Sequence, residues 1–113
     1  MSQKKFDSAI WETVSSIATG RVMSYGEVAR AAGFPRHARM VSKAMGRSTT
    51  ALPWYRVVRS DRTLGFKPGT ESYHKQKALL EQEGVQFLNG KVIPLESDET
   101  EDLDKLLWGP PDV

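Results

Sequence analysis

The stretch RVMSYGEVARAAGFPRHARMVSKAMGRS, residues 21–48, decides the fold. Ser24 stands three residues before Glu27, which is the spacing of a helix capping box, and a short helix is expected to run from there to Gly33. A turn with Pro35 follows, and a second short helix is expected over about residues 36–45. Two short helices joined by a glycine-containing turn predict a helix-turn-helix. The residues expected to pack the second helix inward are Met40, Val41, Ala44 and Met45.

Regular apolar spacing predicts further elements on both sides of this motif. Residues 5 to about 18 repeat apolar side chains at helical intervals, which predicts a helix, and another clear helix is expected from Ser72 to Gly84. Residues 48–56 are expected to form an ordered loop, and residues 57–66 a small hairpin or wing with a polar turn at Ser60 and Asp61. A short strand is expected at KVIPL, residues 91–95. The predicted class is mainly α with a small β wing, a winged-helix-like helix-turn-helix domain.

The length of the chain, 113 residues, predicts one domain spanning residues 1–113. Residues 97–113 are acidic and are expected to form a loosely ordered tail with one helical turn and a frayed end. No apolar run is long enough for a signal peptide or a membrane span, so we expect a soluble protein without membrane contact. We also expect it to be a monomer. Its expected place is the cytoplasm, at the nucleoid if the source is bacterial, or the nucleus if it is eukaryotic.

Basic residues gather in the middle of the chain although the net charge is only +2. Residues 21–67 hold ten of the sixteen lysines and arginines and only two acids, Glu27 and Asp61. This bias predicts a body that binds anions, of which phosphate is the obvious one, although a merely solvated basic surface would look the same. The ten cations are Arg21, Arg30, Arg36, Arg39, Lys43, Arg47, Arg56, Arg59, Arg62 and Lys67.

The second short helix is the candidate recognition helix, because cations lie on it or beside it. Helix-turn-helix proteins usually place this helix in the major groove. Short helix pairs also occur in proteins that never touch nucleic acid, so the motif alone favours DNA binding without requiring it. The residues that could meet phosphates or enter a groove are Arg36, His37, Arg39, Lys43 and Arg47.

The sequence contains no cysteine, which excludes a disulfide framework, a thiolate zinc site and a thiolate nucleophile. The only histidines, His37 and His74, sit in no recognisable triad or metal spacing. We therefore expect no cofactor and no metal. An enzyme that uses Tyr55 or His74 as nucleophile or base is the least favoured hypothesis.

Three stretches together resemble the C-terminal domain of O6-alkylguanine-DNA alkyltransferases: residues 21–48, LPWYRVVRS at 52–60 and KALLEQEG at 77–84. The resemblance spans about residues 6–90. Those enzymes carry a reactive cysteine in a Pro-Cys-His-Arg-Val motif, whereas this chain reads Pro-Trp-Tyr-Arg-Val, with Trp54 at the position of the nucleophile. That substitution is typical of the alkyltransferase-like family, whose members bind the lesion without removing it. An indole is not an activatable nucleophile, so alkyl transfer is not expected.

The resemblance implies roles for the helix-turn-helix residues in a minor-groove complex. Tyr25 would push on the phosphate 3′ of the target, although a tyrosine at a helix start could equally be a hydrophobic staple. Arg39 would enter the base stack as an arginine finger, the alternative being a phosphate contact or a solvated side chain. The small residues Ala38 and Ser42 would allow close approach, with Ser24 and Arg36 on the same DNA-binding surface. Minor-groove entry suits binding that tolerates many sequences.

The resemblance also implies a pocket for the lesion. Trp54 and Phe66 could instead be core aromatics, and Tyr55 departs from the histidine usual in the family. Lys67 would place a cation beside the alkylated base. Arg56 and Glu83 would hold the loop and its supporting helix together, and Ser48 is a candidate for the family's asparagine hinge. The expected pocket residues are Trp54, Tyr55, Val58, Gly65, Phe66 and Lys67.

The function implied is DNA damage recognition without catalysis. The protein would flip O6-alkylguanine out of duplex DNA and flag it for nucleotide excision repair proteins. Flipping costs least where the base is already mispaired or damaged, so selectivity would begin in the DNA. The alternative is a sequence-specific helix-turn-helix transcriptional regulator, which would prefer one operator and ignore alkylation. A regulator has no use for the Pro-Trp-Tyr-Arg-Val motif.

Overall fold

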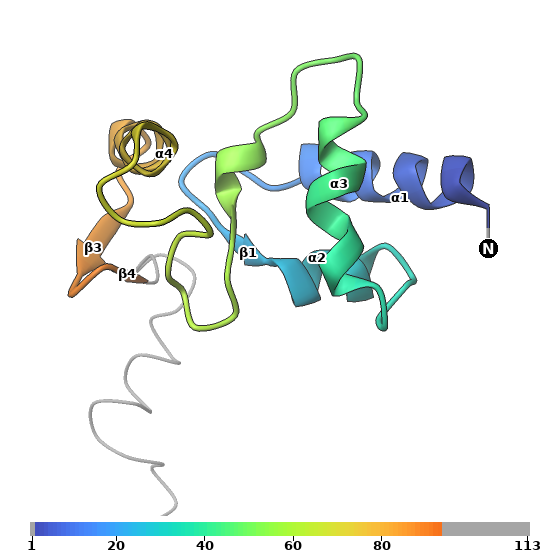
Figure 1. The fold of residues 1–113 in the computed structure, drawn as a ribbon, viewed down its shortest axis with the longest axis horizontal. Coiled ribbons are helices and arrows are strands. Elements are labelled where there is room, and N and C mark those ends of the chain that lie inside the picture. The colour runs from blue at the N-terminus through green and yellow to red at the C-terminus, as the bar shows by residue number, and fades with distance from the viewer. Residues whose placement is uncertain (1, 94–113) are drawn as a thin grey trace, which may run out of the picture.

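The computed structural model describes residues 2–93, which form four α-helices joined by loops and short strands (Figure 1). Helices α1, α2 and α3 lie together on one side, α4 lies with the strands β3 and β4 on the other, and the loops between them cross the middle (Figure 1). The prediction of a mainly helical domain with a small β portion is confirmed. The acidic tail, for which one helical turn is expected, lies outside the described residues. Within residues 2–93 no helix is long and apolar enough to cross a bilayer.

Helix α1, Gln3–Ser15, begins where the Ser2 side chain accepts a hydrogen bond from the Lys5 backbone. Its stripe of Phe6, Ile10 and Val14 is fully buried, as the spacing predicts. The helix ends three residues earlier than expected, yet Ile17 is also buried, because the chain continues along the same core after leaving the helix.

Helix α2, Tyr25–Ala31, confirms the capping box. The Ser24 hydroxyl accepts the Glu27 N–H at 3.1 Å, and the Glu27 carboxylate accepts the Ser24 N–H at 2.7 Å. Because both bonds satisfy N–H groups that an uncapped helix leaves unpaired, the start of α2 is fixed to one residue. Gly33, with a φ of +93°, then turns the chain toward the second helix of the motif.

The second helix of the motif starts later than expected. Residues 34–37 form a turn closed by the His37 N–H to the Phe34 carbonyl, a tight 3₁₀ turn follows at Ala38–Met40, and α3 covers only Val41–Gly46. Val41 and Ala44 are buried as predicted, and Met45 packs partly against the core. The prediction that Met40 packs inward is wrong, since its side chain is 41% exposed. Val41 and Ala44, three residues apart, already occupy the inward face, which turns Met40 outward.

The segment expected to form a hairpin pairs differently. Strand β2, Val57–Val58, lies parallel to β1, Met23–Ser24, so its partner comes from before α2 rather than from across the Ser60–Asp61 turn. The turn itself exists and is closed by the Arg59 N–H to the Thr63 carbonyl at 2.9 Å. The hairpin prediction is therefore wrong in its strands and right in its turn.

The wing lies nearer the end of the described chain, where β3, Gln86–Leu88, pairs antiparallel with β4, Lys91–Ile93. Asn89 and Gly90 join the two strands, and both have positive φ, 52° and 79°, as a two-residue hairpin of this kind requires. The short strand predicted after α4 is thus confirmed as β4, and its partner β3 is an addition that the sequence reading lacked.

Helix α4, Glu71–Gln82, is capped by the Thr70 hydroxyl, which accepts the Tyr73 N–H. The helix supports a second core cluster, separate from the one shared by α1, α2 and α3. The two clusters are linked by β1, β2 and the loops. Helices α2 and α3 of the helix-turn-helix motif therefore pack on the first cluster, and α4 packs on the second. The second cluster consists of Val58, Leu64, Leu80, Val85 and Val92.

Candidate nucleic-acid interface

A groove of about 570 Å³ lies between the start of α2 and the recognition segment, residues 38–46. Tyr25, Ala38, Arg39 and Ser42, four of the six residues predicted to bind DNA, line it together. Of the other two, Ser24 is buried as the cap of α2, and Arg36 is exposed on the turn before the 3₁₀ segment and does not line the groove. Gly26, Arg59 and Ser60 also line the groove.

The cations near this groove are not equivalent. Arg39 is exposed, and none of the ion pairs within residues 2–93 involves it. Arg47, by contrast, binds Asp7 of α1 through two hydrogen bonds of 2.7 Å. These bonds lower the pKa of the Asp7 carboxyl, so the pair is ionised at neutral pH. Arg47 therefore ties the end of α3 to α1, whereas Arg39 is available to an external anion.

A second cavity, of about 390 Å³, adjoins the groove, and we call it the base cavity. Tyr25 and Ser42 line both, so the groove and the base cavity share a wall. Trp54 and Phe66 form an aromatic corner with their rings edge to face at 6.1 Å. The complete lining is Tyr25, Ser42, Met45, Gly46, Thr50, Ala51, Leu52, Trp54, Phe66 and Gln76.

The residues predicted to build the lesion pocket are divided between several places. Trp54 and Phe66 line the base cavity, while Gly65 and Lys67 line a third cavity of about 630 Å³ that shares only Phe66 with it. Tyr55 lines none of these three cavities and packs partly against the second core cluster. Val58 is fully buried within that cluster, so its side chain supports the site from inside the core.

Tyr25 is held close to the loop that follows β2. A Cβ built on Gly65 would lie 3.0 Å from the Tyr25 hydroxyl oxygen, so the close approach of the two segments depends on a residue without a side chain. Burial raises the pKa of the Tyr25 hydroxyl, and the nearby Arg59 charge opposes that shift. The hydroxyl is therefore protonated at neutral pH and can donate a hydrogen bond.

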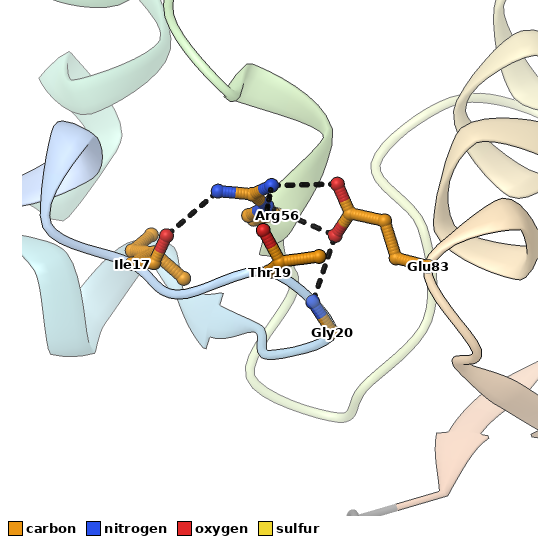
Figure 2. Close-up of polar contacts among 5 residues, drawn as sticks. All are labelled: Ile17, Thr19, Gly20, Arg56 and Glu83. Atoms are coloured by element: carbon orange, nitrogen blue, oxygen red, sulfur yellow. Dashed lines mark hydrogen bonds and ion pairs between the residues drawn. The ribbon is translucent and has the colours of Figure 1, made fainter.

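Arg56 and Glu83 connect the Trp54 loop to the end of α4 (Figure 2). The guanidinium donates to both carboxylate oxygens, at 3.0 and 2.6 Å, which is the bidentate geometry of a strong ion pair. Arg56 also donates to the Ile17 carbonyl at 2.8 Å, and the Gly20 N–H donates to Glu83 at 2.9 Å. Arg56 hydrogen bonds hold the pKa of Glu83 below its ordinary value. Three chain segments thus meet at one pair, as Figure 2 shows.

Two further contacts shape the loop between α3 and Trp54. Ser48, the candidate hinge, donates to the Thr50 carbonyl at 2.9 Å and accepts the Thr50 N–H, which closes a local turn. Gln76 of α4, which the sequence reading passed over, donates from its amide nitrogen to the carbonyls of Tyr55 and Val57. A signal for Gln76 was present, because it stands four residues before the buried Leu80 and hence on the inward face of the helix.

Comparison with known proteins agrees with this arrangement. The profile of the family described as "6-O-methylguanine DNA methyltransferase, DNA binding domain" matches residues 5–85, from α1 through α4. The chain belongs to this family. Within the family it is similar to alkyltransferase-like protein 1 of Schizosaccharomyces pombe, with 36% identity over 77% of this chain and 82% of that protein. It is also similar to the DNA base-flipping protein of Vibrio parahaemolyticus, with 39% identity over 74% of this chain and 84% of the relative.

The fold is likewise that of a solved family member. The crystal structure of S. pombe Atl1 in complex with damaged DNA containing O6-carboxymethylguanine superposes with a TM-score of 0.71 at 32% identity. The match covers 87% of this chain and 95% of the other. The predicted resemblance to the alkyltransferase-like proteins is therefore confirmed for both sequence and fold.

Proposed function

We propose that this protein recognises O6-alkylguanine in duplex DNA and does not repair it. The observation that carries the proposal is the shared wall at Tyr25, where a groove that contains an exposed arginine adjoins a cavity with an aromatic corner at Trp54. A relative named as a base-flipping protein and a structural neighbour solved with damaged DNA support the same conclusion.

The recognition segment would enter the minor groove with its small residues, Ala38 and Ser42, against the sugar edges. Tyr25 would press on the phosphate 3′ of the target base while Arg39 fills the space that the base leaves. The rotating nucleotide then needs a path from the groove to the base cavity, and the residues common to both provide it. The cavity's volume is within the range of small-molecule sites, and an aromatic wall suits stacking against a purine.

Catalysis is not part of the proposal because the site offers no activated nucleophile. The 113 residues include no cysteine, and by the sequence resemblance the indole of Trp54 stands where the repair enzymes carry theirs. Burial, together with Glu83, raises the pKa of the Tyr55 hydroxyl, so it is protonated at neutral pH and a poor nucleophile. Binding without chemistry leaves removal of the lesion to other proteins. That these are excision repair proteins, and that the chain acts as a monomer beside the genome, rests on the resemblance alone.

Titration of the protein against matched duplexes that carry guanine or O6-methylguanine tests the proposal. We expect tighter binding to the methylated duplex, followed by recovery of DNA with its methyl group intact and protein of unchanged mass. A methyl group found on the protein would overturn the claim that it does not repair. Equal affinity for both duplexes with preference for one base sequence would instead favour a transcriptional regulator.

A further inference from the structure

The groove contains a second exposed arginine, for which the sequence predicts no individual role. Arg59 lines the groove from the turn that follows β2, whereas Arg39 lines it from the recognition segment. Arg59 is exposed, and none of the ion pairs within residues 2–93 involves it. An unpaired guanidinium in the wall of a DNA-binding groove is available to a phosphate.

The turn that carries Arg59 is anchored to both α2 and β4. The Arg59 N–H donates to the Thr63 carbonyl at 2.9 Å, and the Arg59 carbonyl accepts the Arg62 N–H at 2.8 Å. The Arg62 side chain pairs with Glu27, which belongs to the cap of α2, and the Arg62 carbonyl accepts the Val92 N–H at 2.9 Å. The backbone that presents Arg59 is therefore fixed relative to the start of α2 before DNA arrives, which lowers the cost of ordering it on binding.

Tyr25, the first residue of α2, lines the same groove. Burial raises the pKa of its hydroxyl, and Arg59 is close enough for its charge to oppose that shift. The protonated hydroxyl can donate a hydrogen bond to a phosphate but carries no charge. A phosphate partly buried against Tyr25 alone would keep an uncompensated charge, which a guanidinium in the same groove can balance.

No acid competes for Arg59 inside the groove, whose lining within the described chain includes two cations and no carboxylate. The nearest acid in the sequence, Asp61, lines the third cavity and not the groove. It accepts the Thr63 hydroxyl at 2.6 Å and the Thr63 N–H at 3.0 Å. These two bonds, more than the Arg59 charge, lower the pKa of the Asp61 carboxyl. Asp61 is therefore committed to the turn.

We propose that Arg59 and Tyr25 together hold the phosphate 3′ of the target base. The assignment rests on the proposed function, because it needs that phosphate to lie in the groove. The Tyr25 hydroxyl donates a hydrogen bond while Arg59 supplies the opposite charge, so the phosphate is held at the wall that the groove and the base cavity share. Arg39, on a different segment, is left to fill the space in the base stack.

The test removes the charge from the protein and from the DNA in turn. The wild-type protein is compared with Arg59→Gln, which has no charge, and with Arg59→Lys, which keeps it. Lys75→Gln is the control, because Lys75 is exposed on α4 and lines none of the three cavities. Each protein is titrated against an O6-methylguanine duplex that carries normal phosphates, an uncharged methylphosphonate 3′ of the lesion, or the same methylphosphonate several nucleotides away. Thermal unfolding establishes that each variant is folded.

The quantity that decides is the coupling between the two changes. Any effect of the methylphosphonate on the duplex itself is the same for every protein and cancels when its effects on affinity are compared between proteins. We expect the methylphosphonate 3′ of the lesion to weaken binding of the wild-type protein, Arg59→Lys and Lys75→Gln by about three- to tenfold more than binding of Arg59→Gln. The distant methylphosphonate should affect all four proteins equally.

An equal effect of the methylphosphonate 3′ of the lesion on the wild-type protein and Arg59→Gln would overturn the assignment, even if Arg59→Gln bound every duplex more weakly. Coupling of Arg59 to the distant phosphate instead would also overturn it. The proposed function is tested separately with a guanine duplex that has normal phosphates. Failure of the wild-type protein to prefer O6-methylguanine over guanine there would overturn the proposed function, whatever Arg59 binds.

Discussion

Arg39 of the recognition segment and two cations of the Trp54 loop, residues 54–62, are used in opposite ways. Arg39 on the recognition segment is exposed and makes no ion pair within the described chain, whereas Arg56 on the loop is bound to Glu83 with both side chains only 13% exposed. Arg62, at the end of the same loop, pairs with Glu27 at 3.1 Å. The basic centre of the sequence is therefore two populations, one available to phosphates and one that holds the cavity in shape.

The exposed and the ion-paired arginines are expected to contribute to DNA binding in different ways. A charge that faces solvent contributes to DNA binding by releasing counterions and by filling the stack. A charge inside an ion pair contributes by keeping the loop in its binding geometry before the base arrives. Substitutions in the two regions should accordingly change different measured quantities.

The largest effect is expected at Glu83. The substitution Glu83→Gln removes the charge partner of Arg56 and weakens the contact to Gly20, so we expect the free energy of unfolding to fall by about 3 kcal/mol at neutral pH. Chemical denaturation measures it, with Glu81→Gln, exposed on the same helix, as the control. An equal loss in both variants would mean that the pair has no special part in stability.

The difference in the free energy of unfolding between the wild-type protein and Glu83→Gln should also depend on pH, which tests the ion pair independently. Because Arg56 lowers the pKa of Glu83 in the folded state, the stabilisation is complete above the pKa in the unfolded chain, about 4.3. It is lost as the pH falls through the lower folded value. The gap between wild type and Glu83→Gln should therefore be constant near neutrality and should narrow in acid. A gap that widened in acid would contradict the ion pair as its source.

The next largest effect is expected at Arg39. The substitution Arg39→Ala should weaken binding to an O6-methylguanine duplex by roughly thirtyfold, about 2 kcal/mol, because the vacated stack has nothing to fill it. Thermal unfolding should be unchanged, since the side chain is exposed. Lys43→Ala is the control, as it removes one exposed cation that does not line the groove. If both variants lost affinity equally for damaged and undamaged DNA, Arg39 would be only a phosphate contact.

The sequence predicted those elements whose structure depends on residues close together in the chain. The capping box at Ser24 and Glu27 set the start of α2, and the apolar stripe from Phe6 set α1, because both depend on neighbours within one or two turns. The Asn89–Gly90 hairpin was equally local and could have been predicted, since that dipeptide favours a two-residue turn. The Pro-Trp-Tyr-Arg-Val motif located the candidate site.

The contacts that spacing could not predict are those between distant segments. Nothing in the sequence around Arg47 indicates that Asp7, forty residues earlier, binds it and withdraws it from the DNA-facing set. Trp54 lines the base cavity, Lys67 lines the third cavity, and Val58 lies in the second core cluster. This distribution likewise depends on how the loop packs on α4. Long-range polar ties determine which of several plausible residues face the ligand.

The smallest effect is expected at Gly65, where the loop meets the groove. The substitution Gly65→Ala places a methyl group 3.0 Å from the Tyr25 hydroxyl oxygen, so the tyrosine must shift by a few tenths of an ångström at the wall that the groove and the base cavity share. We expect affinity for the lesion duplex to fall about threefold, near 0.6 kcal/mol, with little change in thermal stability. Gly46→Ala is the control, because it adds a methyl group to the wall of the base cavity with nothing within 4 Å, so Tyr25 need not move. Equal affinities of the two variants for the lesion duplex would show that the position of Tyr25 does not limit entry of the base. The contribution to lesion binding would then come from Arg39 and not from the contact between Gly65 and Tyr25.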